Sequence, residues 1–256
     1  MRNLVPSIRA LRVWQRNVTT YRHVWLSNVL GHLADPLFYL AVLGFGLGAL
    51  MPPIGELPYM TFLVTGIIAG AAMSSACFET SWASHMRMSQ RTFDAMLATP
   101  LSVADIAAGE ILTAATKGVV SAAATLIIAL VLRLLSPGWW ILPVLGTVLL
   151  QGLFFGGVAL AVSAHARTME ALNHFYALFI MPVLFVSGVF FPLQELPAAL
   201  QVVSTLSPLT HAVHLIRPLA TGAVPPSWLL ELLWIALAAV LGVWLGCASL
   251  SRKMAR

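Results

Sequence analysis

The stretch YMTFLVTGIIAGAAMSSACFET, residues 59–80, is apolar over the length that a helix needs to cross a lipid bilayer. A hydrocarbon core of roughly 30 Å takes about 20 apolar helical residues. Five further stretches of the same kind lie at about 29–51, 106–133, 139–163, 171–191 and 228–250. We therefore expect an all-α integral membrane protein with six transmembrane helices.

The overall composition agrees with this expectation. Hydrophobic residues make up 59% of the 256 residues and charged residues 9%, values that would leave a soluble domain covered with apolar surface. The breaks between the six stretches are too short to fold as soluble domains. Residues 1–256 are thus expected to form a single transmembrane domain.

Arginine and lysine gather on one side of the predicted spans. Eleven of the 14 basic residues precede the first span, follow the last, or lie in the loops after spans two and four. By the positive-inside rule, both termini are then cytoplasmic. Because the positions of these residues matter more than the formal charge of +5, no nucleic-acid partner is expected.

The first 24 residues carry a helical pattern of their own. Apolar residues recur at helical spacing, with arginines on the other faces; these apolar residues are Leu4, Ile8, Leu11, Trp14 and Val18. This pattern predicts an interfacial amphipathic helix over 1–24 that lies in the membrane surface. The alternative is a frayed basic tail.

A short amphipathic segment follows span two, between Arg87 and Ser102. Three residues, Phe93, Met96 and Leu97, share a face at helical spacing. Ser89 or Thr92 is a candidate cap for the start of this helix, and Pro100 ends it. An apolar face on a short cytoplasmic helix needs a partner, either the lipid headgroups or a cytoplasmic protein.

Charged residues inside the predicted spans are few. Glu110 and Lys117 lie seven residues apart in span three, and therefore on one face about two turns distant. Each is expected to reach the interface or to pair with another helix. Glu79 lies near the end of span two, where it is a candidate brace for the short helix.

The region from 181 to 227 is rich in proline, which interrupts the apolar run at Met181-Pro182 and at Phe191-Pro192. We expect a broken or re-entrant segment after span five, because non-helical backbone at membrane depth must be buried in protein or line a cavity. An ordinary external loop is the alternative. His211 and His214 share a helix face, but two histidines without a third ligand make a weak metal site. Hydrogen bonding at the membrane interface is the favoured role, and we expect no metal.

Several motifs of known chemistry are missing from the chain. It has neither a glycine-rich phosphate loop nor a His-Glu-x-x-His helix, and Cys77 and Cys247 fall in separate predicted spans. We therefore expect no catalytic residues and no cofactor bound by this chain. The pairs Gly152-x-x-x-Gly156 and Gly242-x-x-x-Gly246 are interpreted as close helix packing within one subunit.

Four motifs together resemble a known family. These are Asp35-Pro36-Leu37-Phe38-Tyr39-Leu40 with Gly44–Gly48, then Thr92–Leu101, then Ser187-Gly188-Val189-Phe190-Phe191-Pro192, and finally Ser207–Val213 with Arg217-Pro218-Leu219. They occur in the order found in type-2 ABC export permeases, and the chain is most similar to the lipo-oligosaccharide export branch typified by nodulation protein J. The resemblance covers essentially the whole chain.

The resemblance implies a six-helix permease that works as a homodimer above two copies of a separate ATP-binding subunit, which binds ATP and Mg. Residues 89–99 would be the coupling helix of that family. Arg91 and Asp94 would offer charge contacts, while Phe93, Met96 and Leu97 would fill a cleft of the ATPase. Thr99 and Pro100 complete this motif. On this interpretation Phe93→Asp leaves the folded permease in the membrane but uncouples it.

The resemblance also implies a function, namely export of an amphipathic lipid-linked saccharide or lipo-oligosaccharide across a bacterial inner membrane. This chain would be a transport subunit and not itself an enzyme. Exit-pathway candidates lie after span five; they are Ser187, Gly188, Phe191, Pro192, Thr210, His211 and Arg217. The alternatives are drug or antibiotic efflux by the same machinery, and a stand-alone ion-coupled carrier or intramembrane enzyme.

Overall fold

The computed structural model describes residues 5–48 and 50–255; for residues 24–29 and 32 it describes the backbone only. The described chain is helical and forms no sheet. Its helices are α1 Ala10–Tyr39, η1 Leu40–Leu47, α2 Tyr59–Ser89, α3 Thr92–Leu97, α4 Val103–Val131, α5 Ile141–His165, α6 Met169–Phe175, η2 Tyr176–Ile180, α7 Met181–Val186, η3 Leu193–Glu195, α8 Ala198–Thr205, α9 Pro208–Ala220 and α10 Trp228–Met254.

Five helical segments of the described residues are long and apolar enough to cross a membrane. They are Tyr59–Ser89, Val103–Val131, Ile141–His165, Met169–Val186 and Trp228–Met254. Each coincides with one of the predicted spans. The predicted span at 29–51 corresponds to a shorter apolar stretch, Leu33–Leu47, so the six-span count stays a prediction.

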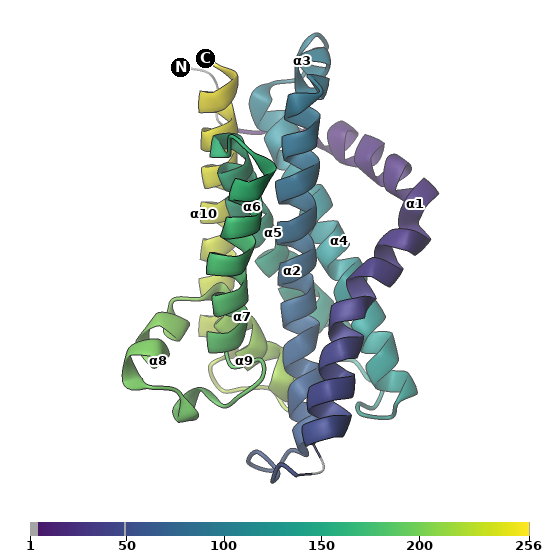
Figure 1. Ribbon diagram of the computed structural model, residues 1–256, viewed down its shortest axis with the longest axis vertical. Helices are drawn as coiled ribbons and strands as arrows, with labels where there is room; N and C mark the ends of the chain where they lie inside the picture. Colours follow the sequence, from purple (N-terminus) through teal and green to yellow (C-terminus); the bar gives the residue numbers. More distant parts are fainter. Residues whose placement is uncertain (1–4, 49, 256) are drawn as a thin grey trace.

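The N-terminal region differs from the expected pair of separate helices. Residues 5–9 are not helical, and α1 then runs without interruption from Ala10 to Tyr39 and continues as η1. Leu4 lies outside the described residues. Figure 1 shows that α1 starts near the α3 end, leads away from the other helices to a bend, and then returns to run along the bundle. One bent helix thus replaces the predicted interfacial helix followed by a break.

Span five is shorter than predicted at its second end, and it tolerates Pro182. The helix widens to a π-helical turn over Tyr176–Ile180 just before Pro182, which lies in the first turn of α7. The helix ends at Val186, and Gly188, with φ +75°, turns the chain. The apolar residues up to 191 are therefore a turn and not part of the span.

Small residues let the central helices approach closely. A side chain at Gly157 would meet the Gly242 backbone, and one at Gly152 would meet the Ala115 backbone. These contacts join α5 to α10 and to α4 within one chain. The interpretation of the glycine pairs as packing inside a subunit is confirmed for these contacts.

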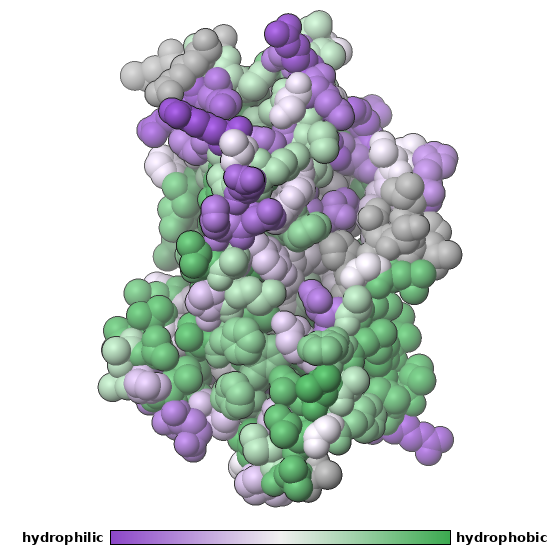
Figure 2. All heavy atoms as spheres, in the orientation of Figure 1, coloured by the Kyte–Doolittle hydropathy of each residue, from purple (hydrophilic) through white to green (hydrophobic). Residues whose placement is uncertain are grey.

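The two ends of the bundle differ in polarity. The α3 end also holds both ends of the described chain, whereas α8 and α9 lie at the opposite end (Figure 1). Figure 2 shows hydrophilic side chains gathered at the α3 end, and mostly apolar side chains over the rest of this face. The bundle therefore presents a polar end that carries α3.

Candidate functional site: the α3 loop and its polar anchors

The segment from Gln90 to Ser102, here called the α3 loop, joins α2 to α4. It begins with Arg91 in the left-handed conformation, at φ 55°, and this residue caps α3 without a side-chain hydrogen bond. The predicted capping by Ser89 or Thr92 is therefore wrong. The Thr99 hydroxyl donates to the Met96 carbonyl oxygen at 2.6 Å and closes the end of the helix.

The apolar face of α3 packs on the permease itself. Phe93 is 1% exposed and Met96 is 9% exposed, in a cluster with Val13, Ile106 and other buried side chains. The expectation that Phe93 and Met96 fill a cleft of another subunit is thus wrong, because their surface is already buried. Leu97 is half-buried at the edge of this cluster.

The outward face of the α3 loop carries the other predicted coupling residues. Arg91, Asp94, Thr99 and Pro100 are all exposed. They present one positive and one negative charge at the polar end of the bundle. This face is what a protein docking at that end would contact.

The start of the chain holds the α3 loop in place. The Arg9 guanidinium donates to the carbonyl oxygen of Pro100, and an Arg16 guanidinium nitrogen lies 3.3 Å from the Met96 sulfur. Both arginines come from the N-terminal region that was expected to lie on the membrane. The N-terminal region therefore holds the α3 loop in place through these two arginines.

A second anchor lies where the α3 loop enters α4. Ser102 and Asp105 cap each other reciprocally at the start of this helix. The Asp105 carboxylate also accepts bonds from the Ser7 backbone N–H at 2.6 Å and from the Ser7 hydroxyl at 2.8 Å. One carboxylate thus joins the start of the chain to the end of the loop.

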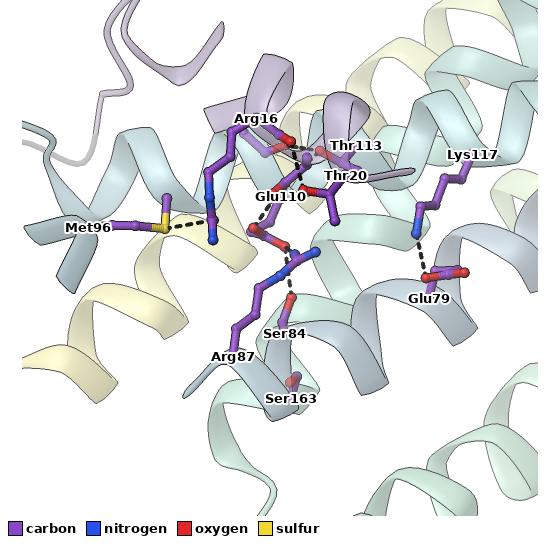
Figure 3. A network of polar contacts seen from close by, with 12 residues as sticks. Arg16, Thr20, Glu79, Ser84, Arg87, Met96, Glu110, Thr113, Lys117 and Ser163 are labelled. Atoms are coloured by element: carbon purple, nitrogen blue, oxygen red, sulfur yellow. Dashed lines mark hydrogen bonds and ion pairs between the residues drawn. The ribbon is translucent and has the colours of Figure 1, made fainter. Parts of the chain in front are cut away.

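Glu110, predicted as an intramembrane charge, joins three helices. Its carboxylate forms an ion pair with Arg87 of α2, and it accepts a bond from Asn17 of α1 at 2.9 Å. Ser84 lies 3.4 Å from the same carboxylate. Figure 3 shows Arg87 and Ser84 converging on Glu110. The expected pairing of Glu110 with another helix is confirmed.

Lys117 pairs with Glu79 at 2.6 Å, again between α4 and α2 (Figure 3). Its ammonium nitrogen also lies 4.9 Å from the ring centroid of Tyr21 on α1, a distance typical of a cation–π contact. Glu79 therefore contacts α4, and its expected role as a brace for the short helix stays a prediction. Glu110 lies two turns closer to the α3 end along α4.

The exit-pathway candidates lie at the opposite end of the bundle. Ser187 contacts the Ser207 hydroxyl at 3.0 Å, and the Gly188 carbonyl oxygen accepts a bond from Arg217 at 2.8 Å. The Arg217 guanidinium also lies 3.5 Å from the ring centroid of Phe62. Arg217 thus makes its contacts inside the protein, and its expected place on the exit pathway stays a prediction.

The two histidines face α10. His211 pairs with Glu231 through one ring nitrogen and lies 2.8 Å from the Thr205 carbonyl oxygen through the other. His214 lies 3.5 Å from the same carboxylate. No group of three or more His, Cys, Asp or Glu among the described residues is arranged to hold a metal. The expected hydrogen-bonding role of the histidines is confirmed.

The remaining exit candidates show no common site. Thr210 is buried, and its hydroxyl has no hydrogen-bond partner among the described residues. Phe191 is exposed and Pro192 half-buried in the turn after α7. The structure brings Ser187, Gly188 and Arg217 close to the same turn, but it does not gather all seven candidates.

Sequence reasoning missed the anchors from the N-terminal region and the role of Arg87. One signal was present, because Ser102-x-x-Asp105 before an apolar run is a capping-box pattern. Asn17 and Ser7 carry no such signal. Their partners lie 93 and 98 residues away in sequence.

Comparison with known proteins places this architecture in a family. A family model for ABC-2 type transporters matches residues 10–219. The chain is 39% identical over 219 residues to nodulation protein J of Rhizobium leguminosarum bv. trifolii, covering 84% of this chain and 82% of that protein. It is 36% identical over 245 residues to nodulation protein J of Neorhizobium galegae, covering 94% and 92%. Identity to the inner membrane transport permease YadH of Escherichia coli is 21% over 201 residues, covering 78% of each chain. The chain is a multi-pass membrane protein that belongs to the ABC-2 type transporter family.

Proposed function

We propose that this chain is the permease subunit of an ATP-binding cassette exporter in a bacterial inner membrane. Its cargo is an amphipathic lipid-linked saccharide or lipo-oligosaccharide, and a separate subunit hydrolyses the ATP. Family membership and the similarity to nodulation protein J over most of the chain support this proposal. Cytoplasmic termini follow from the positive-inside rule, and both ends of the described chain lie beside α3.

The observation that carries the proposal is the α3 loop. Its apolar side is fixed to the permease through Phe93, while Arg91 and Asp94 remain exposed on the outward side. A loop fixed in this way can pass a displacement by a docked protein on to the helices, whereas a mobile loop would move without shifting them. The ATPase is therefore expected to contact the charged outward face.

The contacts of the α3 loop with α1 and α4 can transmit a displacement of the loop to the helices of the bundle. A push on α3 acts on α1 through Arg9 and Arg16, and on the start of α4 through Ser102. The Arg87–Glu110 pair connects α2 with α4 just below the loop. Two ATPase copies closing on bound ATP and Mg would push the loops of a permease homodimer together and switch its access between the two sides of the membrane.

The test is purification of the tagged chain from its native membranes in mild detergent, followed by mass spectrometry and an ATPase assay. We expect a stoichiometric ATP-binding subunit. Asp94→Lys should release this subunit because it reverses a charge at the contact. Glu56→Lys, the same change at an exposed residue of the α1–α2 connection, is the matched control and should retain it.

A lone protein without associated ATPase activity would refute the proposal. Equal retention by the Asp94→Lys and Glu56→Lys variants would refute docking on α3. The cargo is tested separately with inverted membrane vesicles, by following ATP-dependent uptake of a fluorescent acyl-oligosaccharide. Uptake that is the same in vesicles lacking the permease would refute the proposed cargo.

A further inference from the structure

A cavity of about 480 Å³ lies between α1, α2 and the α6–α7 segment. None of the exit-pathway candidates lines it. Its α2 wall is a stripe of residues spaced three and four apart from Ile67 to Glu79, a length of roughly 18 Å along the helix. The small residues Gly70, Ala71 and Ser75 in this stripe make the space.

The cavity changes in character along its length. Nearer α3 its α2 wall holds Ser74 and Glu79, and Asp35 lines it from α1. At the other end it holds Ile67, Val189 and other apolar side chains. A site with a polar end and an apolar end fits an amphiphile, with the head directed toward α3.

Aromatic rings lie at both ends of the cavity. Tyr39 and Phe190 have ring centroids 4.9 Å apart at the apolar end. Phe78 stacks on Trp82 at 4.2 Å, with the Tyr176 ring edge-on at 5.9 Å, at the polar end. These rings offer flat apolar surfaces beside the carboxylates.

The polar groups in the wall favour ligands that donate hydrogen bonds. Ser75 is 1% exposed, and its hydroxyl has no hydrogen-bond partner among the described residues. The Ser75 hydroxyl is thus closed off from the cavity, whereas its neighbour Ser74 lines the same wall and is half-buried, so the Ser74 hydroxyl is the one that a ligand can meet. The two carboxylates are acceptors when ionised, and none of the described residues that line the cavity is basic.

This charge pattern discriminates among head groups. Glu79 is paired with Lys117, whereas Asp35 adds a negative charge to the wall. An anionic head would be repelled there, and no described basic side chain of the lining would compensate. A hydroxyl-rich or ammonium head finds acceptors instead, and an ammonium gains further from the aromatic rings.

We propose that this cavity binds the cargo, and that it selects an amphiphile whose head donates hydrogen bonds and carries no negative charge. The inference rests on the proposed export function, and it adds the site, the orientation and the head-group class. The head lies beside Asp35 and Ser74, and the apolar chain extends toward Phe190. A sugar or an amine supplies the same donor chemistry.

The test uses three amphiphiles with one dodecyl chain that ends in a photoreactive group, carrying a disaccharide, a primary ammonium or a phosphate head. Each is irradiated with the full-length chain in lipid nanodiscs, and labelled peptides are identified by mass spectrometry. We expect saturable labelling of residues 184–190 by the disaccharide or ammonium probe, and at least fivefold less labelling by the phosphate probe. Whichever donor probe labels more strongly identifies the source of the donors.

Substitutions locate the head. Ser74→Ala should weaken labelling about three- to tenfold, because one hydrogen bond is lost. Ser75→Ala is the matched control, since Ser75 is the next residue of the same helix but its hydroxyl is buried. Asp35→Asn should reduce the preference of the cavity for the disaccharide and ammonium probes over the phosphate probe.

Three results would overturn the inference: equal labelling by the phosphate probe, no saturable labelling by either donor probe, or equal effects of the two serine substitutions. Labelling confined to the Phe78 end would overturn the orientation. None of these measurements requires the ATPase. If the ATP-binding subunit does not co-purify but labelling is intact, the proposed function is refuted and the cavity assignment stands. If the subunit co-purifies but labelling is absent, the cavity assignment is refuted and the proposed function stands.

Discussion

Removing Arg87 should expose how much the bundle depends on the buried Glu110 carboxylate. Glu110 is 3% exposed, and the Arg87 side chain is 23% exposed. Breaking a buried ion pair by removing one partner costs about 3–5 kcal/mol. Because Arg87 reaches water and Glu110 keeps its bond from Asn17, we expect Arg87→Met to cost about 3 kcal/mol, at the low end of this range.

The double substitution gives the sharper result. Glu110→Gln on its own should cost roughly 1.5–3 kcal/mol, the value of a hydrogen bond to a charged group. With Arg87→Met and Glu110→Gln together no buried charge is left without a partner, so the total should fall short of the sum by about 2 kcal/mol. The measurement is reversible unfolding of the four proteins in mixed micelles of mild detergent and sodium dodecyl sulfate.

The control is Arg91→Met, which removes an exposed arginine from the adjacent α3 loop. It should change the free energy of unfolding by less than about 0.5 kcal/mol. A coupling free energy below about 0.5 kcal/mol between Arg87 and Glu110 would show that the pair does not join α2 to α4, and the proposed route of force would lose that step.

Three further changes test the packing. Phe93→Ala should cost about 3–5 kcal/mol because it empties a buried site, so size-exclusion chromatography should show loss of folded protein; full stability would mean that Phe93 faces outward after all. Gly157→Ala places a methyl group against the Gly242 backbone and should cost about 1–3 kcal/mol, whereas Gly146→Ala has open space and should not lower the thermal midpoint; equal midpoints would refute the α5–α10 packing. Arg217→Lys should cost about 1–2 kcal/mol in the same unfolding assay, because a lysine does not reproduce the planar contacts of a guanidinium; an unchanged value would contradict the structural role of Arg217.

The apolar runs predicted five of the helices well. They located the helix ends poorly where the apolar run and the helix end at different residues. The second helix continues to Ser89, nine residues past the predicted end, because its last turns are polar yet remain helical beside α4. The apolar run of span five instead continues past the helix, which ends at Val186. In both places backbone geometry, and not polarity, sets the end.

The candidate site was also predicted only in part from the sequence. The rarity of charge inside spans marked Glu110 and Lys117 correctly, but seven-residue spacing says only that they share a face and not which helix lies opposite. Periodicity likewise found the apolar face of α3 through Phe93 and Met96. It carries no information on whether that face is covered by the same chain or by another protein, and the structure assigns it to the same chain.

The two walls of the cavity differ in how firmly they are held. On one side, α2 is enclosed by other helices, with 83% of its apolar stretch buried. On the other side, α1 and η1 leave Phe38 and Phe45 exposed, and the same α1 reaches the α3 loop through Arg9 and Arg16 at its start. Because α1 connects the α3 loop to the cavity through a bend (Figure 1), a push on the loop should move the α1 wall more than the enclosed α2 wall. If the export function holds, the ATPase therefore changes the width of the cavity from its Asp35 and Tyr39 side.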